Sequence, residues 1–318
     1  MADAVAYAAA RESAAVAELS ERGVLAVSGP QRQKFLHSML SNELASRAPG
    51  QGCLAALMDV KGRQLAWMRA LVTADAVLLE MNAERLQPVE QVLLHYKVGA
   101  PVRFAARPTA VRGLLGPQAR AVLARAGAEI PELAAEAHVQ AMVAGHAVLV
   151  ARASDVPWGG HVLHTAPEAA AAVREALIAA GAAPLDRATL DVLRIEAGLP
   201  WYGPDVGEEN LLHETGQLAV YHSFSKGCYL GQEVVARLEG RGGNVNKKLC
   251  GLRLSQPAAA GAAITADGQP VGQVTTAGVS PRLGAVALGY VHRSHFEPGT
   301  ALAVGDAPAT VVALPFPD

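Results

Sequence analysis

The pattern of apolar residues changes near residue 245, and this change most constrains how the 318-residue chain can fold. Before it, apolar residues recur at both helical and strand spacing. After it, short β-type segments alternate with turns that contain Gly or Pro, and no helix pattern is found. These segments are residues 249–254, 262–266, 271–276, 285–291, 301–304 and 310–313. We therefore predict a small β-barrel or β-sandwich over residues 246–318, joined through the Gly-rich stretch Gly240–Gly243 to a larger unit over residues 1–245.

The larger unit mixes predicted helices and strands, so the expected fold class is α+β. Strands are predicted at Val24–Val27, 53–58, 63–72, 76–81, 101–106, 111–115 and 139–151, and helices at 30–42, 83–95, 117–126, 168–180 and 187–196. Asp59 and Gly62 enclose a four-residue turn between the second and third strands. Asp at the start and Gly at the end fit a type I turn with a bulge, which predicts a hairpin there.

Composition and charge exclude several classes of protein. With 51% hydrophobic and 18% charged residues, the chain is not expected to be disordered. A formal net charge of −2 argues against a basic face for duplex nucleic acid. Three scattered cysteines do not make a disulfide framework, residues 2–19 lack a leader pattern, and no apolar run reaches 18 residues. We expect a cytoplasmic protein that binds neither membrane nor nucleic acid directly.

Cys228 lies in the densest polar motif of the chain, Lys226–Arg237 (KGCYLGQEVVAR). Lys226 precedes it, and a helix pattern starts near Gly231. A positive charge and a helix N-terminus both favour the thiolate, which is the reactive form of cysteine. The alternative is a buried structural cysteine, and spacing alone does not decide between the two.

Glu196 is predicted at the C-terminal end of the helix over 187–196. A carboxylate there opposes the helix dipole, which costs a few tenths of a kcal/mol, about the size of other exposed dipole effects. A fixed carboxylate can accept two parallel N–H donors from the edge of a ring. The alternative is a solvated side chain on an exposed last turn.

Other charged stretches carry weaker signals. The hairpin tip Asp59–Arg63 and the linker Arg241–Lys248 are both compatible with plain solvation, although the linker could also bind an anionic tail. His161 with His164, and His292 with His295, have no third ligand nearby in the sequence, so no metal site is predicted.

Several of these motifs together resemble one known family. Lys226–Arg237 matches the K-G-C-[FY]-x-G-Q-E-x-x-x-R signature of YgfZ-type folate-binding proteins, which are relatives of the aminomethyltransferase (T-protein) of the glycine cleavage system. Phe35–Glu43, Lys61–Arg63 and Gly272–Pro281 resemble further motifs of these proteins. Arg194–Gly203 is similar to the R-x-E-A-G-x-P-x-Y-G stretch of the T-proteins.

The resemblance implies the aminomethyltransferase fold, with subdomains around a central channel that binds tetrahydrofolate or a one-carbon derivative. It implies that Glu196 binds the pterin edge, and that Asn42, Arg194, Tyr202 and Arg237 complete the folate site. In the YgfZ-type branch the signature cysteine supports iron–sulfur enzymes, and through one of them tRNA thiolation. Carried over, Cys228 is the functional thiol, with Lys226 beside it, and iron–sulfur client proteins or assembly factors are the expected partners.

One departure from the T-proteins bears on activity. Their catalytic aspartate belongs to a K-D pair shortly after a V-N-A stretch, but here Pro88-Val89 occupies that position and Glu90 lies one residue further. A factor for iron–sulfur proteins is therefore expected rather than an active aminomethyltransferase. The alternatives are an aminomethyltransferase that transfers a one-carbon unit to tetrahydrofolate, and a folate sensor in which Cys228 is inert.

Overall fold

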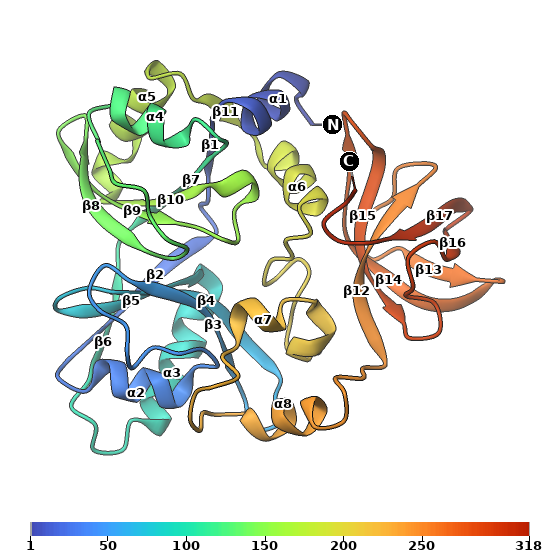
Figure 1. The fold of residues 1–318 in the computed structure, drawn as a ribbon, viewed down its shortest axis with the longest axis horizontal. Helices are drawn as coiled ribbons and strands as arrows, with labels where there is room; N and C mark the ends of the chain where they lie inside the picture. The colour runs from blue at the N-terminus through green and yellow to red at the C-terminus, as the bar shows by residue number, and fades with distance from the viewer. Residues whose placement is uncertain (1, 318) are drawn as a thin grey trace.

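The computed structural model describes residues 2–317 as two β-sheets and a barrel grouped around α6 (Arg187–Glu196) and α7 (Leu218–Tyr221) (Figure 1). The N-terminal 245 residues form both sheets, and the barrel stands beside them on the right of the view. This is the predicted α+β class with a C-terminal β module. The closed barrel settles the choice between a barrel and a sandwich.

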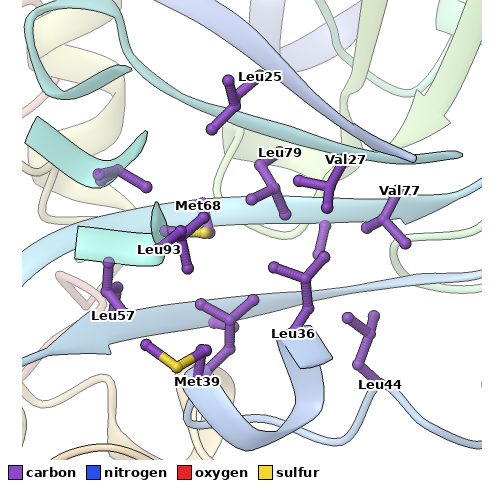
Figure 2. Packing of buried hydrophobic residues seen from close by; sticks show 14 of the residues in the cluster. Leu25, Val27, Leu36, Met39, Leu44, Leu57, Met68, Val77, Leu79 and Leu93 are labelled. Carbon is purple, nitrogen blue, oxygen red and sulfur yellow. The ribbon is translucent and has the colours of Figure 1, made fainter. Parts of the chain in front are cut away.

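The five-stranded sheet is antiparallel and has the order β3-β4-β5-β2-β6. Its strands are β2 (Arg22–Ser28), β3 (Gly52–Met58), β4 (Gln64–Val72), β5 (Ala76–Asn82) and β6 (Arg103–Arg107). Two helices, α2 (Arg32–Met39) and α3 (Leu86–Tyr96), cover one face. Leu36 and Met39 of α2 and Leu93 of α3 point into the apolar layer between helices and sheet (Figure 2). The apolar face predicted for the helix over 30–42 is thus confirmed in α2. The helix is shorter than predicted, because Leu40 is extended and pairs with Leu57.

The six-stranded sheet has the order β11-β1-β7-β10-β9-β8. Its strands are β1 (Ala15–Glu18), β7 (Ala110–Leu115), β8 (His138–Val143), β9 (His146–Arg152), β10 (His161–Thr165) and β11 (Ala183–Leu185). The helices α1 (Ala4–Glu12), α4 (Ala119–Arg125) and α5 (Ala170–Ala179) belong to this half. The predicted strand over 139–151 is two strands, because Ala144 and Gly145 both adopt positive φ and turn the chain.

The barrel closes in the order β12-β15-β14-β13-β16-β17. Its strands are β12 (Lys247–Leu254), β13 (Ala263–Ala266), β14 (Gln269–Ser280), β15 (Gly284–His292), β16 (Ala301–Val304) and β17 (Ala307–Val312). Gly278 of β14 lies against α6, where a Cβ atom would come within 2.6 Å of Val192. The barrel therefore packs on the helix that carries Arg194 and Glu196.

Candidate functional site

An aromatic cavity of about 130 Å³, here called the central cavity, lies where α7 and the chain after α6 meet the five-stranded sheet. Four aromatic side chains line it: Trp67, Trp201, Tyr202 and Tyr221. Trp67 stacks on Tyr221 with ring centroids 4.1 Å apart. Polar groups complete the lining, from Glu21, Arg22, Asn82, Asp155 and Arg187. Such a cavity suits a flat ring that bears hydrogen-bonding groups.

The orientation of the aromatic residues follows from their hydrogen bonds. The hydroxyl group of Tyr202 donates to the carbonyl of Gln64 at 3.0 Å, and burial raises its pKa to about 12. The indole N–H of Trp201 donates to the carbonyl of Asp155 at 3.2 Å. Both polar ends are therefore held by backbone carbonyls.

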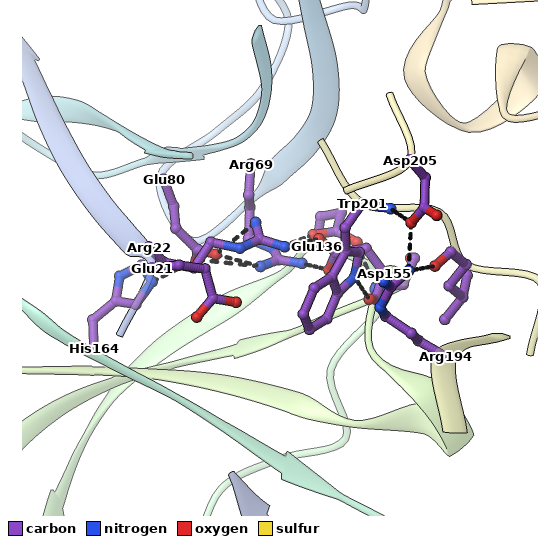
Figure 3. Close-up of polar contacts among 12 residues, drawn as sticks. Glu21, Arg22, Arg69, Glu80, Glu136, Asp155, His164, Arg194, Trp201 and Asp205 are labelled. Carbon is purple, nitrogen blue, oxygen red and sulfur yellow. Dashed lines mark hydrogen bonds and ion pairs between the residues drawn. The ribbon is translucent and has the colours of Figure 1, made fainter. Parts of the chain in front are cut away.

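A buried network of charges lies next to the central cavity and links the two sheets (Figure 3). Arg69 of β4 contacts Glu80 on the adjacent strand β5, and also Glu136 and Asp155 from the other half of the unit. Its Nε atom lies 2.6 Å from a Glu136 carboxylate oxygen. Arg22 of β2 reaches Glu80 at 3.4 Å and Asp155 at 3.5 Å. Because Arg22 and Asp155 also line the central cavity, the network fixes part of its wall.

Glu196, the predicted pterin acceptor, is buried at the end of α6 and is not among the residues that line the central cavity. Its carboxylate accepts hydrogen bonds from the Tyr7 hydroxyl of α1, at 2.8 and 3.0 Å, and lies 3.4 Å from Nη2 of Arg282. The solvated alternative is thereby wrong, because Glu196 is 2% exposed. In this structure the carboxylate already has donors on the barrel side and on α1.

Arg194 lies behind the central cavity. Its guanidinium group is over the ring of Trp201, with 5.0 Å to the centroid, and it pairs with Asp205 and, at 2.7 Å, with Asp191. It also donates to the Thr276 hydroxyl of β14 at 3.0 Å. The residue therefore connects α6, the aromatic wall and the barrel.

Asn42 follows α2 in the chain. Its side-chain amide donates to the carbonyls of Leu54, at 2.8 Å, and Val220, at 3.1 Å. These bonds tie β3 to α7, whose last residue is Tyr221 of the central cavity. Of the predicted folate residues, only Tyr202 is itself in the lining of this cavity.

Cys228 is exposed in the loop before α8 (Gln232–Glu239), as the helix pattern near Gly231 predicted. Gly231 has φ +83°, and a Cβ atom there would meet the carbonyl oxygen of Asp59 at 2.5 Å. Gly62 of the same hairpin tip has φ +74° and lies against Val234 of α8. Two motifs more than 160 residues apart thus meet in space, and glycine permits both close approaches.

Lys226 is turned away from solvent. Its ammonium group donates to the carbonyls of His37, at 2.6 Å, and Leu40 at the end of α2, and it lies 4.7 Å from the centroid of the Tyr229 ring. Burial lowers its pKa to about 8. Its positive charge therefore balances the C-terminal end of α2. Arg237, in the last turn of α8, is exposed.

The other two cysteines differ from Cys228. Cys53 is buried in β3, and burial raises the pKa of its thiol to about 12. Cys250 is buried in β12, and burial raises its pKa to about 11. Among residues 2–317 there is no cluster of three or more metal-ligating side chains, and none of the helices has the length and apolar character of a membrane crossing.

A larger cavity of about 920 Å³, here called the barrel cavity, lies between the barrel and residues 203–210. It shares Pro204 with the central cavity. Tyr290 of β15 lines it, and the Tyr290 hydroxyl is buried without a hydrogen-bond partner among residues 2–317. Lys247 and His292 contribute basic groups to the same lining.

The segment in which the sequence differs from the K-D pair of the T-proteins lies in α3. Pro88 lies in the first turn of this helix, and Val89 is buried against the core of the five-stranded sheet. Glu90 is half-buried and is not part of the central-cavity lining.

Several lining residues were missed by sequence reasoning, above all Arg22, Trp67, Asp155 and Tyr221. Each comes from a different segment, and no local spacing connects them. One sequence signal points to the adjacent charge network: a charged residue within an apolar strand, as at Arg69 and Glu80. In the structure these two residues form a directly opposed cross-strand pair.

Comparison with known proteins is consistent over nearly the whole chain. Residues 3–225 match the GCVT N-terminal domain, and residues 247–318 match the glycine cleavage T-protein C-terminal barrel domain. A chloroplastic protein of Arabidopsis thaliana named as a transferase is 29% identical, over 94% of this chain and 70% of its own. An aminomethyltransferase of Saccharopolyspora erythraea is 30% identical, over 99% and 89%. The fold is similar to that in the crystal structure of the glycine cleavage system aminomethyltransferase T from Bartonella henselae, with a TM-score of 0.87 and 24% sequence identity. The match covers 98% of this chain and 89% of that chain.

Proposed function

Because the chain belongs to the glycine cleavage T-protein family, in its N-terminal domain and in its barrel domain, we propose that it is a tetrahydrofolate-binding factor that supports iron–sulfur proteins. The proposal places it in the YgfZ-type branch, with Cys228 as its functional thiol. We also propose residues 1–245 and 246–318 as its two units, since α8 ends at Glu239 and the barrel begins at Lys247.

The observation that carries the proposal is the contrast between the three cysteines. Cys228 is exposed on a loop held by two glycine contacts, whereas Cys53 and Cys250 are buried and their thiols have raised pKa values. A thiol that must reach a partner protein, a cluster or a sulfur donor has to be accessible. Phe224, four residues before Cys228 in the same loop, exposes 62% of its surface, which adds an exposed apolar side chain to this loop.

The two cavities support folate as the ligand. Tetrahydrofolate supplies a carrier for one-carbon units through its reduced pterin. The central cavity would receive the flat ring between aromatic faces, with Tyr202 and Asn82 in its wall. At about 130 Å³ it is smaller than the roughly 300–1,000 Å³ of common ligand sites, so the rest of the ligand needs the adjoining barrel cavity. There the buried Tyr290 hydroxyl lacks a partner, and Lys247 provides a cation for an anionic tail.

The roles of this chain's residues follow from their contacts. Arg194 orients Trp201 from behind, and Asn42 fixes α7 and thereby Tyr221. Glu196 is the proposed pterin acceptor, which requires that the Tyr7 hydroxyl give up its hydrogen bonds to the carboxylate. Lys226 anchors the Cys228 loop to the end of α2, and Arg237 stands exposed on α8, where it can contact an approaching anion.

Two measurements test the proposal together. Calorimetric titration with tetrahydrofolate should give saturable binding. The same titration followed by fluorescence should show quenching of Trp67 and Trp201, which line the central cavity. Expression of the chain in cells that lack their own factor of this kind should restore iron–sulfur enzyme activity, and the Cys228→Ala form should not. Folate binding without rescue by the parent chain would instead favour the sensor alternative.

Aminomethyltransferase activity is the second candidate, favoured by the names of relatives that match over nearly their full length. The sequence of α3 argues against this activity, because Pro88 and the buried Val89 stand where the T-proteins have their K-D pair. A reconstituted glycine cleavage system in which this chain replaces the T-protein decides between the two: folate-dependent methylene transfer would establish the enzyme.

A further inference from the structure

A separate cavity of about 330 Å³, here called the Trp158 cavity, lies in the half of the chain that holds the six-stranded sheet. Its lining comes from the start of α4, from residues 132–133, and from the ends of β9 and β10 with the loop between them. It shares no lining residue with the central cavity or the barrel cavity. Its volume is at the lower end of the roughly 300–1,000 Å³ of common ligand sites.

Two arginines give the Trp158 cavity an excess of positive charge. Arg120 of α4 is exposed, and its guanidinium group has no hydrogen bond or ion pair among residues 2–317. Arg152 of β9 is half-buried and donates from Nη1 to the carbonyl of Gly160 at 2.9 Å, which leaves other N–H donors of its guanidinium group for a ligand. One carboxylate, that of Glu132, also belongs to the lining, and it forms an ion pair with neither arginine.

The loop between β9 and β10 holds Arg152 at the cavity. Trp158 has φ 50° and ψ 44°, the left-handed region that a bulky side chain rarely adopts, and Gly159 follows with φ +73°. A Cβ atom on Gly159 would come within 2.8 Å of Nη2 of Arg152, so glycine lets the guanidinium group rest on this backbone. Strained backbone of this kind is concentrated at ligand sites.

His161 of β10 is the buried polar part of the lining, with 7% of its surface exposed. Burial lowers its pKa to about 4, and the charges of Arg152 and Arg120 act in the same direction. Both guanidinium groups are thus near the same ring, although they come from different elements. The ring is neutral at pH 7, so the positive charge of the cavity is that of the arginines.

Trp158 adds an aromatic surface to the same cavity. Its side chain is half-buried, and the guanidinium group of Arg11 on α1 lies over its ring, with 5.6 Å to the centroid. Flat rings such as nucleobases stack on tryptophan, because every base has a π face. An indole ring together with two arginines matches a ligand that has a flat ring at one end and an oxyanion at the other.

We propose that the Trp158 cavity binds a nucleoside monophosphate, with its phosphate group between Arg120 and Arg152 and its base against Trp158. A guanidinium group can donate two parallel hydrogen bonds to phosphate oxygens, and Arg120 and Arg152 both have donors to spare. This site is independent of the proposed folate site, because the two have no residue in common.

Adenosine 5′-monophosphate (AMP) is the probe, and isothermal titration of the full chain is the measurement. AMP should bind saturably, both alone and in the presence of saturating tetrahydrofolate. Adenosine, which lacks the oxyanion, should not bind. Ribose 5-phosphate, which lacks the base, should bind about fivefold or more weakly than AMP, since base stacking on an aromatic side chain is lost.

Variants of the lining test each half of the ligand. Arg120→Gln removes one exposed charge and should weaken AMP binding by about tenfold or more. Arg253, exposed on β12 outside the cavity, supplies the matched control, and Arg253→Gln should bind AMP as the parent does. Trp158→Leu should weaken AMP binding by about fivefold or more and leave the affinity for ribose 5-phosphate unchanged.

The proposal is overturned if AMP does not bind, if tetrahydrofolate displaces it, or if Arg120→Gln binds it as tightly as the parent. Equal affinity for AMP and ribose 5-phosphate would show a phosphate site without a base site and would overturn it as well. Because Arg120 is at the surface, these results remain decisive even where Trp158→Leu fails to fold.

Discussion

Replacement of Glu196 and of its partner Tyr7 separates a ligand-binding role for the carboxylate from a structural one. In the structure the Tyr7 hydroxyl donates to both carboxylate oxygens, at 2.8 and 3.0 Å. A hydrogen bond to a charged group is worth about 1.5–3 kcal/mol. If the pterin takes the place of Tyr7, this free energy is lost on binding and reduces the affinity for folate.

The two variants should therefore move folate affinity in opposite directions. Tyr7→Phe removes the competing donor, so the dissociation constant for tetrahydrofolate should fall by about tenfold or more, at about 1.4 kcal/mol per factor of ten. Glu196→Ala removes the acceptor, which should cost about 2–4 kcal/mol of binding free energy, or a weakening of roughly 30- to 1,000-fold. Both variants should lose about 1–3 kcal/mol of unfolding free energy, because a buried hydrogen bond is broken in each.

Isothermal titration with tetrahydrofolate, together with urea unfolding, measures both quantities in the same samples. If Glu196→Ala loses stability but binds folate as the parent does, Glu196 is a structural acceptor for Tyr7 and not part of the site. If Glu196→Ala weakens binding and Tyr7→Phe leaves it unchanged, the displacement of Tyr7 is refuted while the role of Glu196 stands.

Three further predictions rest on other parts of the molecule. Iodoacetamide at neutral pH should modify Cys228 before Cys53 and Cys250, as peptide mapping of the alkylated protein would reveal; earlier modification of a buried cysteine would contradict this. In a reconstituted glycine cleavage system the chain should transfer no measurable methylene group, and robust folate-dependent transfer would overturn the argument from α3. Arg69→Met should lower the unfolding free energy by about 3–5 kcal/mol, because it leaves buried carboxylates without their main cation. Because the pKa of Glu80 is lowered in the folded protein, the charge network stabilises the fold at pH values above the ordinary carboxyl pKa. Urea unfolding at decreasing pH should therefore show a falling free energy of unfolding. A loss below about 1 kcal/mol in Arg69→Met would refute this role of Arg69.

Local sequence signals predicted the elements that carry the motifs. The turn at Asp59–Gly62 and the start of α8 after Gly231 depend on residues whose backbone preferences are readable from the chain. The helix over Arg187–Glu196 has the predicted bounds, since Asp186 caps its first turn. The N-terminal helix α1 was not predicted, because its alanines give little apolar contrast between its faces.

The arrangement of the site could not be predicted in the same way. Lys226 lies two residues before Cys228, which suggested a charge beside the thiol, yet its ammonium group donates to the carbonyls at the end of α2. The Arg69 network draws on two sheets and two loops. Such contacts depend on how the sheets face each other, and spacing along one chain contains no information on that.

The central claim is that Cys228 carries the function of this chain and that folate binding occurs elsewhere in it. Cys228→Ser tests this most directly, because it changes one exposed atom. We predict that the variant binds tetrahydrofolate as tightly as the parent and fails to restore iron–sulfur enzyme activity in cells that lack their own factor. Restoration to the level of the parent would contradict the account.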